Sequence, residues 1–176
     1  MATGELRKKG LKAYFALKRM IDLSALTPKI VFKLFDALIL PIVSYGSVIW
    51  LQSTQCTKTI LRSTTNKTKL RQMAADPMER LHLKFLKWTL LVHKKCSNLA
   101  CYGDSGRYPL YIRLAKQATS YFNRLDSPDA GENSTLVRHA FAEQKKSRLG
   151  WYTNMKKLLD VAGPTNERDM PRPSDI

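Results

Sequence analysis

Residues 76–95 read DPMERLHLKFLKWTLLVHKK, and this stretch decides the fold class. Asp76 suits an N-cap, Pro77 suits the first helical position, and Glu79 completes a strong helix-start signal. At about 100° per residue, the apolar side chains form a stripe and a narrower second one: Met78, Leu81, Phe85, Trp88 and Val92, with Leu83, Leu86 and Leu90. We therefore expect an amphipathic helix that runs to about Lys95.

Helical periodicity extends over most of the chain. Apolar residues between Leu11 and Ile21 recur at spacings of three and four, which predicts another amphipathic helix. Thr27 and Pro28 form an N-cap and a first helical position, so a helix is expected from there, kinked at Pro41. Its expected buried stripe is Ile30, Val31, Leu34, Phe35, Leu38 and Ile39. Further helices are expected after Ser97, from Pro109, after Ser134 and near Trp151. The residues predict an all-α fold, an irregular bundle of five to seven helices.

Two segments lack a helical pattern. Residues 52–75 are rich in Thr, Lys and Gln, with no apolar period beyond Ile60 and Leu61, so we expect a mobile basic loop there. Residues 163–176 are polar and carry three prolines, so we expect a disordered tail. We divide the remainder into a basic helical domain over residues 1–125 and a charge-neutral helical extension over residues 126–162.

The charge is the main clue to function. The 176 residues carry 30 Lys and Arg against 14 Asp and Glu, a net charge of +16. Residues 1–125 hold 22 of the basic side chains and six of the acidic ones, so the whole excess lies there. A localised positive field attracts polyanions, which favours nucleic acid first, an anionic membrane surface second and an acidic protein third.

The reactive residue types point away from catalysis. Three cysteines are an odd and sparse set, which favours a reducing, intracellular location in the nucleus or cytoplasm. A zinc site can be assembled on paper from His82, His93, Cys96 and Cys101, but their spacing is poor, so we expect no metal and no cofactor. The six acids before residue 126 are scattered, whereas two-metal phosphoryl transfer needs clustered carboxylates. We expect the chain to be no enzyme by itself.

Three separated segments resemble one known family. The first is Lys9-Gly10-Leu11-Lys12-Ala13. The second, residues 34–50, reads LFDALILPIVSYGSVIW against the family pattern L-F-D-x-x-V-x-P-x-L-x-Y-G-x-E-x-W. The third joins Glu79, His82, Phe85 and Lys87, in E-x-x-H-x-x-F-x-K, to Gly106-Arg107-Tyr108-Pro109-Leu110, in G-x-x-P-L. In this order, across roughly residues 6 to 125, they resemble the region after the catalytic palm in reverse transcriptases of non-LTR (LINE-type) retrotransposons.

The resemblance implies a thumb and post-thumb segment of an RNA-directed DNA polymerase, without the palm. The family's catalytic Tyr/Phe-x-Asp-Asp lies upstream of this region, and no Asp-Asp pair occurs in this sequence. Val48 stands where the family usually has Glu, a departure that points to divergence or decay of a mobile element. Thumb helices in such enzymes resemble a clamp on the template–primer duplex. The implied partners are therefore the backbone of RNA or an RNA–DNA duplex, and originally the palm of the same polyprotein.

Basic helix faces and a basic loop suit contact with a nucleic-acid backbone without readout of base sequence. Tyr14 and Tyr45 are candidates for contact with sugar or base, and a place in the core is the alternative for each. The candidate phosphate contacts are Lys12, Lys18 and Arg19 in the first helix, Lys58, Arg62, Lys67, Lys69 and Arg71 in the loop, and Arg80, Lys84 and Lys87 in the helix after Asp76.

Two other function classes stay open. With the palm absent, the apolar helix over residues 39–50 would be exposed, which predicts a protein-interaction module that self-associates. Residues 34–51 contain one charged residue, Asp36, and approach the length needed to cross a bilayer, so membrane attachment ranks last.

Overall fold

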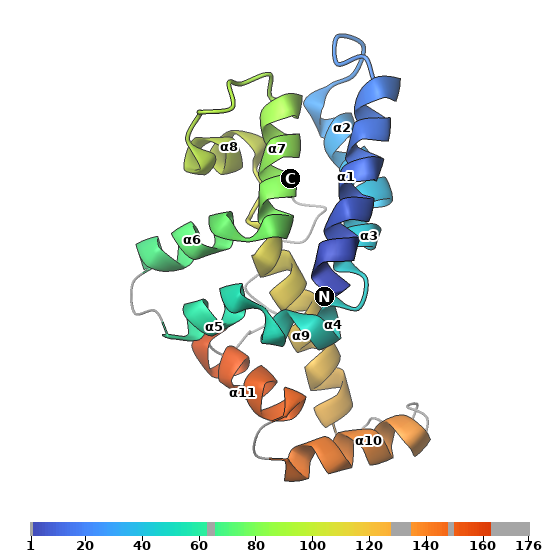
Figure 1. Cartoon of the computed structure of the whole chain (residues 1–176), viewed down its shortest axis with the longest axis vertical. Helices are drawn as coiled ribbons and strands as arrows, with labels where there is room; N and C mark the ends of the chain where they lie inside the picture. The colour runs from blue at the N-terminus through green and yellow to red at the C-terminus, as the bar shows by residue number, and fades with distance from the viewer. Residues whose placement is uncertain (1, 63–65, 128–134, 148–149, 163–176) are drawn as a thin grey trace.

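The computed structural model describes residues 2–62, 66–127, 135–147 and 150–162. These residues form helices and connecting turns with no strand among them, which confirms the all-α prediction. The helices outnumber the five to seven expected (Figure 1). In chain order they are α1 (Ala2–Met20), α2 (Pro28–Leu34), η1 (Phe35–Ile39), α3 (Leu40–Ser44), α4 (Ser47–Trp50), η2 (Leu51–Ser53), α5 (Gln55–Arg62), α6 (Asn66–Ala75), α7 (Pro77–Thr89), α8 (Asn98–Ser105), α9 (Leu110–Asp126), α10 (Thr135–Lys146) and α11 (Trp151–Ala162).

Helices α1 and α7 lie side by side (Figure 1). Gly10 faces Leu81, while one turn later the Tyr14 ring lies 6.3 Å from the Phe85 ring. Because both residue numbers rise together, the two helices run in the same direction. The Phe85 ring also lies 4.6 Å from Phe35, so these three aromatic side chains form the centre of the hydrophobic core.

The helix expected from Thr27 to Leu51 is broken into pieces. Its start is confirmed, because Thr27 is extended and Pro28 opens α2. Before Pro41 the backbone widens into the π-helical turn η1, in which the N–H of Leu40 donates to the carbonyl of Phe35. A proline has no N–H to donate, and π turns commonly accommodate such interruptions. A second break follows at Gly46, whose φ of 63° is left-handed.

Part of the expected stripe in this segment is exposed. Val31, Phe35 and Ile39 are buried, as expected, whereas Ile30 and Leu38 keep 45% and 51% of their surface accessible. The buried side chains recur at a spacing of four, from Val31 through Phe35 and Ile39 to Val43, and Ile30 and Leu38 lie beside this row. The expected stripe of six buried residues was therefore too wide.

The prediction of a mobile basic loop over residues 52–75 was also wrong. That segment contains η2, α5 and α6, and α5 packs against α6. Thr54 caps the start of α5, since its Oγ1 accepts the N–H of Thr57 at 3.2 Å. Cys56, Thr57 and Ile60 are buried, and the Thr57 hydroxyl bonds to that of Tyr111 in α9 at 2.8 Å. The Thr54 cap and the helical spacing of Cys56 and Ile60 were signals of a helix, and the polar composition of the segment concealed them.

The C-terminal helices complete the lower part of the molecule in Figure 1. Phe122 of α9, Phe141 of α10 and Trp151 of α11 form an aromatic cluster with ring centroids 5.6 to 6.3 Å apart. The indole N–H of Trp151 donates to the carbonyl of Val48 at 2.7 Å. The core of the N-terminal helices therefore continues into α11. The expected disordered tail, residues 163–176, lies outside the described residues.

Candidate nucleic-acid interface

The cations expected on α1 are exposed. Gly10, Tyr14 and Leu17 are buried, so this side of the helix faces the core. Lys12, Lys18 and Arg19 are exposed, and among the described residues no carboxylate lies within 4.0 Å of any of them. Of the acids nearest in sequence, Glu5 is paired with Lys8 at 2.8 Å, and Asp22 accepts the N–H and the hydroxyl of Ser24 at 2.9 and 2.8 Å. The outer face of α1 is therefore a surface of unpaired positive charge.

Helix α7 places a second set of cations beside this face. The Asp76 carboxylate accepts the N–H of Met78 at 2.8 Å, which confirms the expected N-cap. Arg80 and Lys84 are exposed, and the Lys84 ammonium lies 4.6 Å from the centre of the Phe15 ring and 5.6 Å from that of Tyr14. Because Lys84 reaches over these α1 side chains, the basic faces of the two helices are continuous. We call Lys12, Lys18, Arg19, Arg80 and Lys84 the α1–α7 basic face.

Lys87 does not belong to this face in the structure. Its ammonium donates to the carbonyls of Lys94 at 3.0 Å and Cys96 at 2.7 Å, and the side chain is half-buried. Helix α7 ends at Thr89 instead of near Lys95, and Leu91 takes a left-handed φ of 55°. Lys87 therefore satisfies two carbonyls of the turn that follows α7, which occupy two of its three donors.

The remaining candidates lie on α5 and α6, and α6 leads into α7 and packs against it (Figure 1). Lys58, Arg62 and Arg71 are exposed and Lys69 is half-buried, whereas the side chain of Lys67 lies outside the described residues. Because α5 and α6 are helices, their cations are held at defined positions instead of on a mobile loop. The candidate cations are thus distributed over four helices, α1, α5, α6 and α7.

The exposure of the aromatic side chains differs from what the sequence predicts. Tyr14 is 1% exposed in the core, where burial raises the pKa of its phenol, so Tyr14 cannot contact sugar or base. Tyr45 is 76% exposed but follows a stretch without charge. Phe15, which the apolar period assigned to the core, is 45% exposed among the cations of α1. No sequence signal distinguishes Tyr14 from Phe15, because neighbouring positions on one helix both border the apolar stripe.

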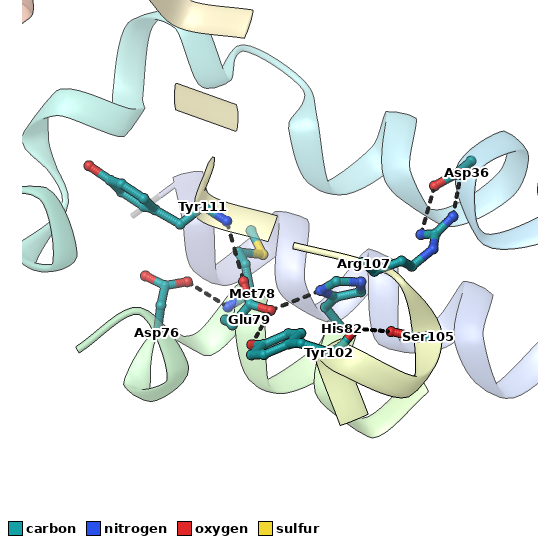
Figure 2. Close-up of polar contacts among 9 residues, drawn as sticks. All are labelled: Asp36, Asp76, Met78, Glu79, His82, Tyr102, Ser105, Arg107 and Tyr111. Atoms are coloured by element: carbon teal, nitrogen blue, oxygen red, sulfur yellow. Dashed lines mark hydrogen bonds and ion pairs between the residues drawn. The ribbon is translucent and has the colours of Figure 1, made fainter. Parts of the chain in front are cut away.

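A buried polar network joins α7, α8 and α9 (Figure 2). The Glu79 carboxylate, 1% exposed, contacts Nδ1 of His82 and accepts the hydroxyl of Tyr102, each at 2.8 Å. It also accepts the backbone N–H of Tyr111 at 3.3 Å. Burial raises the pKa of the Tyr102 and Tyr111 phenols, that of Tyr111 to about 12, so both keep their protons near neutral pH. With His82 3% exposed, the network is closed to substrates and positions the helices.

Asp36 forms a second link between distant segments (Figure 2). Its carboxylate accepts hydrogen bonds from Nη1 and Nη2 of Arg107 and from Nη1 of Arg113, the last at 2.8 Å. Arg107 also lies over the Phe32 ring, 5.0 Å from its centre, and donates to the Phe32 carbonyl at 3.3 Å. The ion pairs fasten η1 to the start of α9, residues 71 and 77 positions apart in the chain. Arg107 and Arg113 are thereby partly neutralised.

Three other kinds of site were considered from the sequence or the structure: a metal site, a membrane-spanning helix and a ligand cavity. Among the described residues no group of three or more His, Cys, Asp or Glu side chains could hold a metal ion, and His82 is committed to Glu79. No helix of the described part has both the length and the apolar character to cross a membrane. A cavity of about 10 Å³ beside Trp50 and Tyr111 has room for about one water molecule. The exposed basic faces are thus the strongest candidate site.

Comparisons with known proteins add no family. No family model matches the chain, and neither the curated proteins nor the solved structures contain a match to it.

Proposed function

We propose that the chain is a non-catalytic, thumb-like segment of a LINE-type reverse transcriptase that binds the backbone of a template–primer duplex through basic helix faces. The observation that supports it most is the α1–α7 basic face, five exposed cations on two adjacent helices. Among the described residues these cations have no ion-pair partner. Like charges placed side by side repel each other by a few tenths of a kcal/mol per close pair, a cost that a bound polyanion would reverse.

The shape of the surface favours a backbone ligand. Lys12 and Arg19 lie two turns apart on α1, a rise of about 10 Å, so they can reach phosphates about three nucleotides apart on one strand. Long, exposed Lys and Arg side chains neutralise phosphates without reading base edges. The proposed contact is therefore independent of sequence, as a polymerase clamp requires.

Several residues that carry the family resemblance hold helices together in the structure. Glu79 and His82 form the closed network between α7 and α8, and Asp36 and Arg107 fasten η1 to the segment before α9. These contacts give the pattern residues Asp36, Glu79 and His82 a structural role without any catalytic step, whereas Arg107 stands at a variable position of the pattern. The pattern thus acts as a signature of helix packing, which agrees with a clamp that lies beside a separate catalytic palm.

Salt titration of duplex binding tests the proposal. We would measure the anisotropy of a labelled RNA–DNA duplex with the wild-type chain at increasing salt. Contacts with about six phosphates predict a slope of log K against log salt near −5. No binding at low salt, or binding without salt dependence, would contradict the proposal.

Matched charge variants then locate the contact. Replacing Lys12, Lys18, Arg19 and Arg80 by Gln should flatten the slope by about 3 to 4 units. The control replaces Lys29, Lys33, Lys156 and Lys157, which are also exposed, and removes the same charge elsewhere. If both variants lose the same amount, binding follows net charge and the α1–α7 basic face is not the site.

A protein-interaction module is the second candidate. Leu38, Tyr45 and Ile49 are 51%, 76% and 67% exposed. Exposed apolar side chains of this kind are where a palm or a second copy would pack. Sedimentation of the wild type and of a Leu38→Gln/Ile49→Gln variant separates the candidates, because self-association that this variant abolishes, without salt-dependent duplex binding, favours the interaction module.

A further inference from the structure

Phe15 is an exposed aromatic side chain surrounded by positive charge. Its ring is 45% exposed and packs at 5.1 Å against the buried Tyr14 ring, which holds it against the helix. The Lys84 ammonium lies 4.6 Å from the ring centre. Lys12, Lys18 and Arg19 stand three or four residues away on the same helix and are exposed, so they are its neighbours on the surface.

Core packing does not account for this placement. The side of α1 that faces the core is supplied by Gly10, Tyr14 and Leu17. An aromatic ring among cations matches the two features that bind single strands, a π face for stacking and ammonium or guanidinium groups for the phosphates. Tyr45 provides a contrast within the same chain, because it is more exposed but lies in the uncharged stretch from Ala37 to Leu51.

We propose that Phe15 is a stacking site for an unpaired nucleobase, with Lys12, Arg19 and Lys84 on the flanking phosphates. The inference rests on the proposed nucleic-acid function and adds to it a contact that backbone binding does not include. The expected ligand is a single strand, or the unpaired end next to a duplex. Stacking is tolerant of base identity because every base presents a π face, so the site adds affinity without sequence preference.

The test uses a labelled oligothymidylate of about ten nucleotides and the same oligomer with abasic sites. Anisotropy is measured for the wild type and for three variants of the full chain. Phe15→Leu removes the ring but keeps an apolar side chain, and Phe15→Trp keeps an aromatic face. Tyr45→Leu is the control, an exposed aromatic residue in a stretch of sequence without charge. Circular dichroism and thermal unfolding confirm that each variant folds.

Phe15→Leu is expected to bind oligothymidylate about 5- to 20-fold more weakly, with an unchanged salt slope, because the phosphate contacts remain. Phe15→Trp and Tyr45→Leu should stay within about twofold of the wild type. The wild type should bind the abasic oligomer more weakly than oligothymidylate. Phe15→Leu should bind the two oligomers equally, because it has no ring on which a base can stack.

Equal binding of the two oligomers by the wild type, or equal affinity of Phe15→Leu and the wild type, would overturn the stacking site. Either result leaves the proposed function intact if the RNA–DNA duplex still binds with a steep salt slope. Loss of that slope in the wild type would instead refute the nucleic-acid function itself.

Discussion

Gly10 and Leu81 meet where α1 crosses α7: a Cβ added to Gly10 would lie 2.9 Å from Cδ2 of Leu81 and 2.7 Å from Cγ1 of Val43. Leu81 and Val43 are both buried, so neither can move aside without disturbing the core. The absence of a side chain at residue 10 is therefore what lets the two basic helices lie close together.

Gly10→Ala should destabilise the protein by about 1–2 kcal/mol, because overpacking in a filled core exceeds the gain in helix propensity. Gly4→Ala is the control, since nothing lies within 4 Å of a Cβ at that position of the same helix. It should be neutral or stabilising by up to about 1 kcal/mol. Urea unfolding of both variants measures the difference, and shifts of the same sign would contradict the close approach.

Glu79→Gln should destabilise the protein by about 1–3 kcal/mol. The amide keeps the shape of the carboxylate but replaces one acceptor oxygen by a donor, which leaves His82, Tyr102 or the N–H of Tyr111 without its acceptor. Glu5→Gln, in an exposed i,i+3 pair with Lys8, should not change the unfolding free energy measurably. A Glu79→Gln variant as stable as the wild type would show that the network contributes nothing.

Lys87→Gln should change the stability of the protein, whereas Lys84→Gln should change its binding to the duplex. Lys87 donates to two carbonyls of the turn after α7, so its replacement should lower the free energy of unfolding by about 0.5–1.5 kcal/mol and leave the duplex salt slope unchanged. Lys84→Gln should flatten the slope by about one unit if it contacts a phosphate. Thermal unfolding and salt titration of both variants measure the two quantities, and a flattened slope for Lys87→Gln would place its ammonium on the ligand.

Alkaline pH should destabilise the fold. Burial raises the pKa of the Cys56 thiol from 9.0 to about 12 and that of the Tyr111 phenol from 10.0 to about 12. Both groups are neutral when protonated, so their stabilising contribution is complete below the unfolded pKa and is lost as the pH rises through the folded pKa. The unfolding free energy should therefore fall between about pH 9 and pH 12.

Tyr111→Phe checks the origin of this pH dependence. The variant loses the hydrogen bond to Thr57 and should be less stable at pH 8, but its stability should fall less steeply above pH 10 because one ionisable phenol is gone. Urea unfolding at several alkaline pH values measures the slope. An identical slope in the variant and the wild type would assign the alkaline loss to other groups.

Local signals in the sequence predicted a large part of the fold. The Asp76 cap and Pro77 start α7, and Pro28 starts α2, because a cap or a proline acts on its own neighbours. Helix α8 follows Ser97 as expected, although the Ser97 side chain makes no cap hydrogen bond. The excess of basic residues before residue 126 was also visible without a structure. Where the local signal was weak, as at the Thr54 cap of α5, a polar composition was mistaken for a loop.

The sequence by itself determined the all-α class, the main helix starts and the position of the positive charge, because caps, apolar periods and charge are properties of short segments. Only the tertiary structure decided that Tyr14 is buried and Phe15 exposed, that Lys87 turns to carbonyls, and which acceptors surround Glu79. The reason is physical: adjacent positions on a helix differ by about 100°, and the partner helix selects which of them is covered. Contacts such as Tyr102 with Glu79 join residues that no local pattern connects.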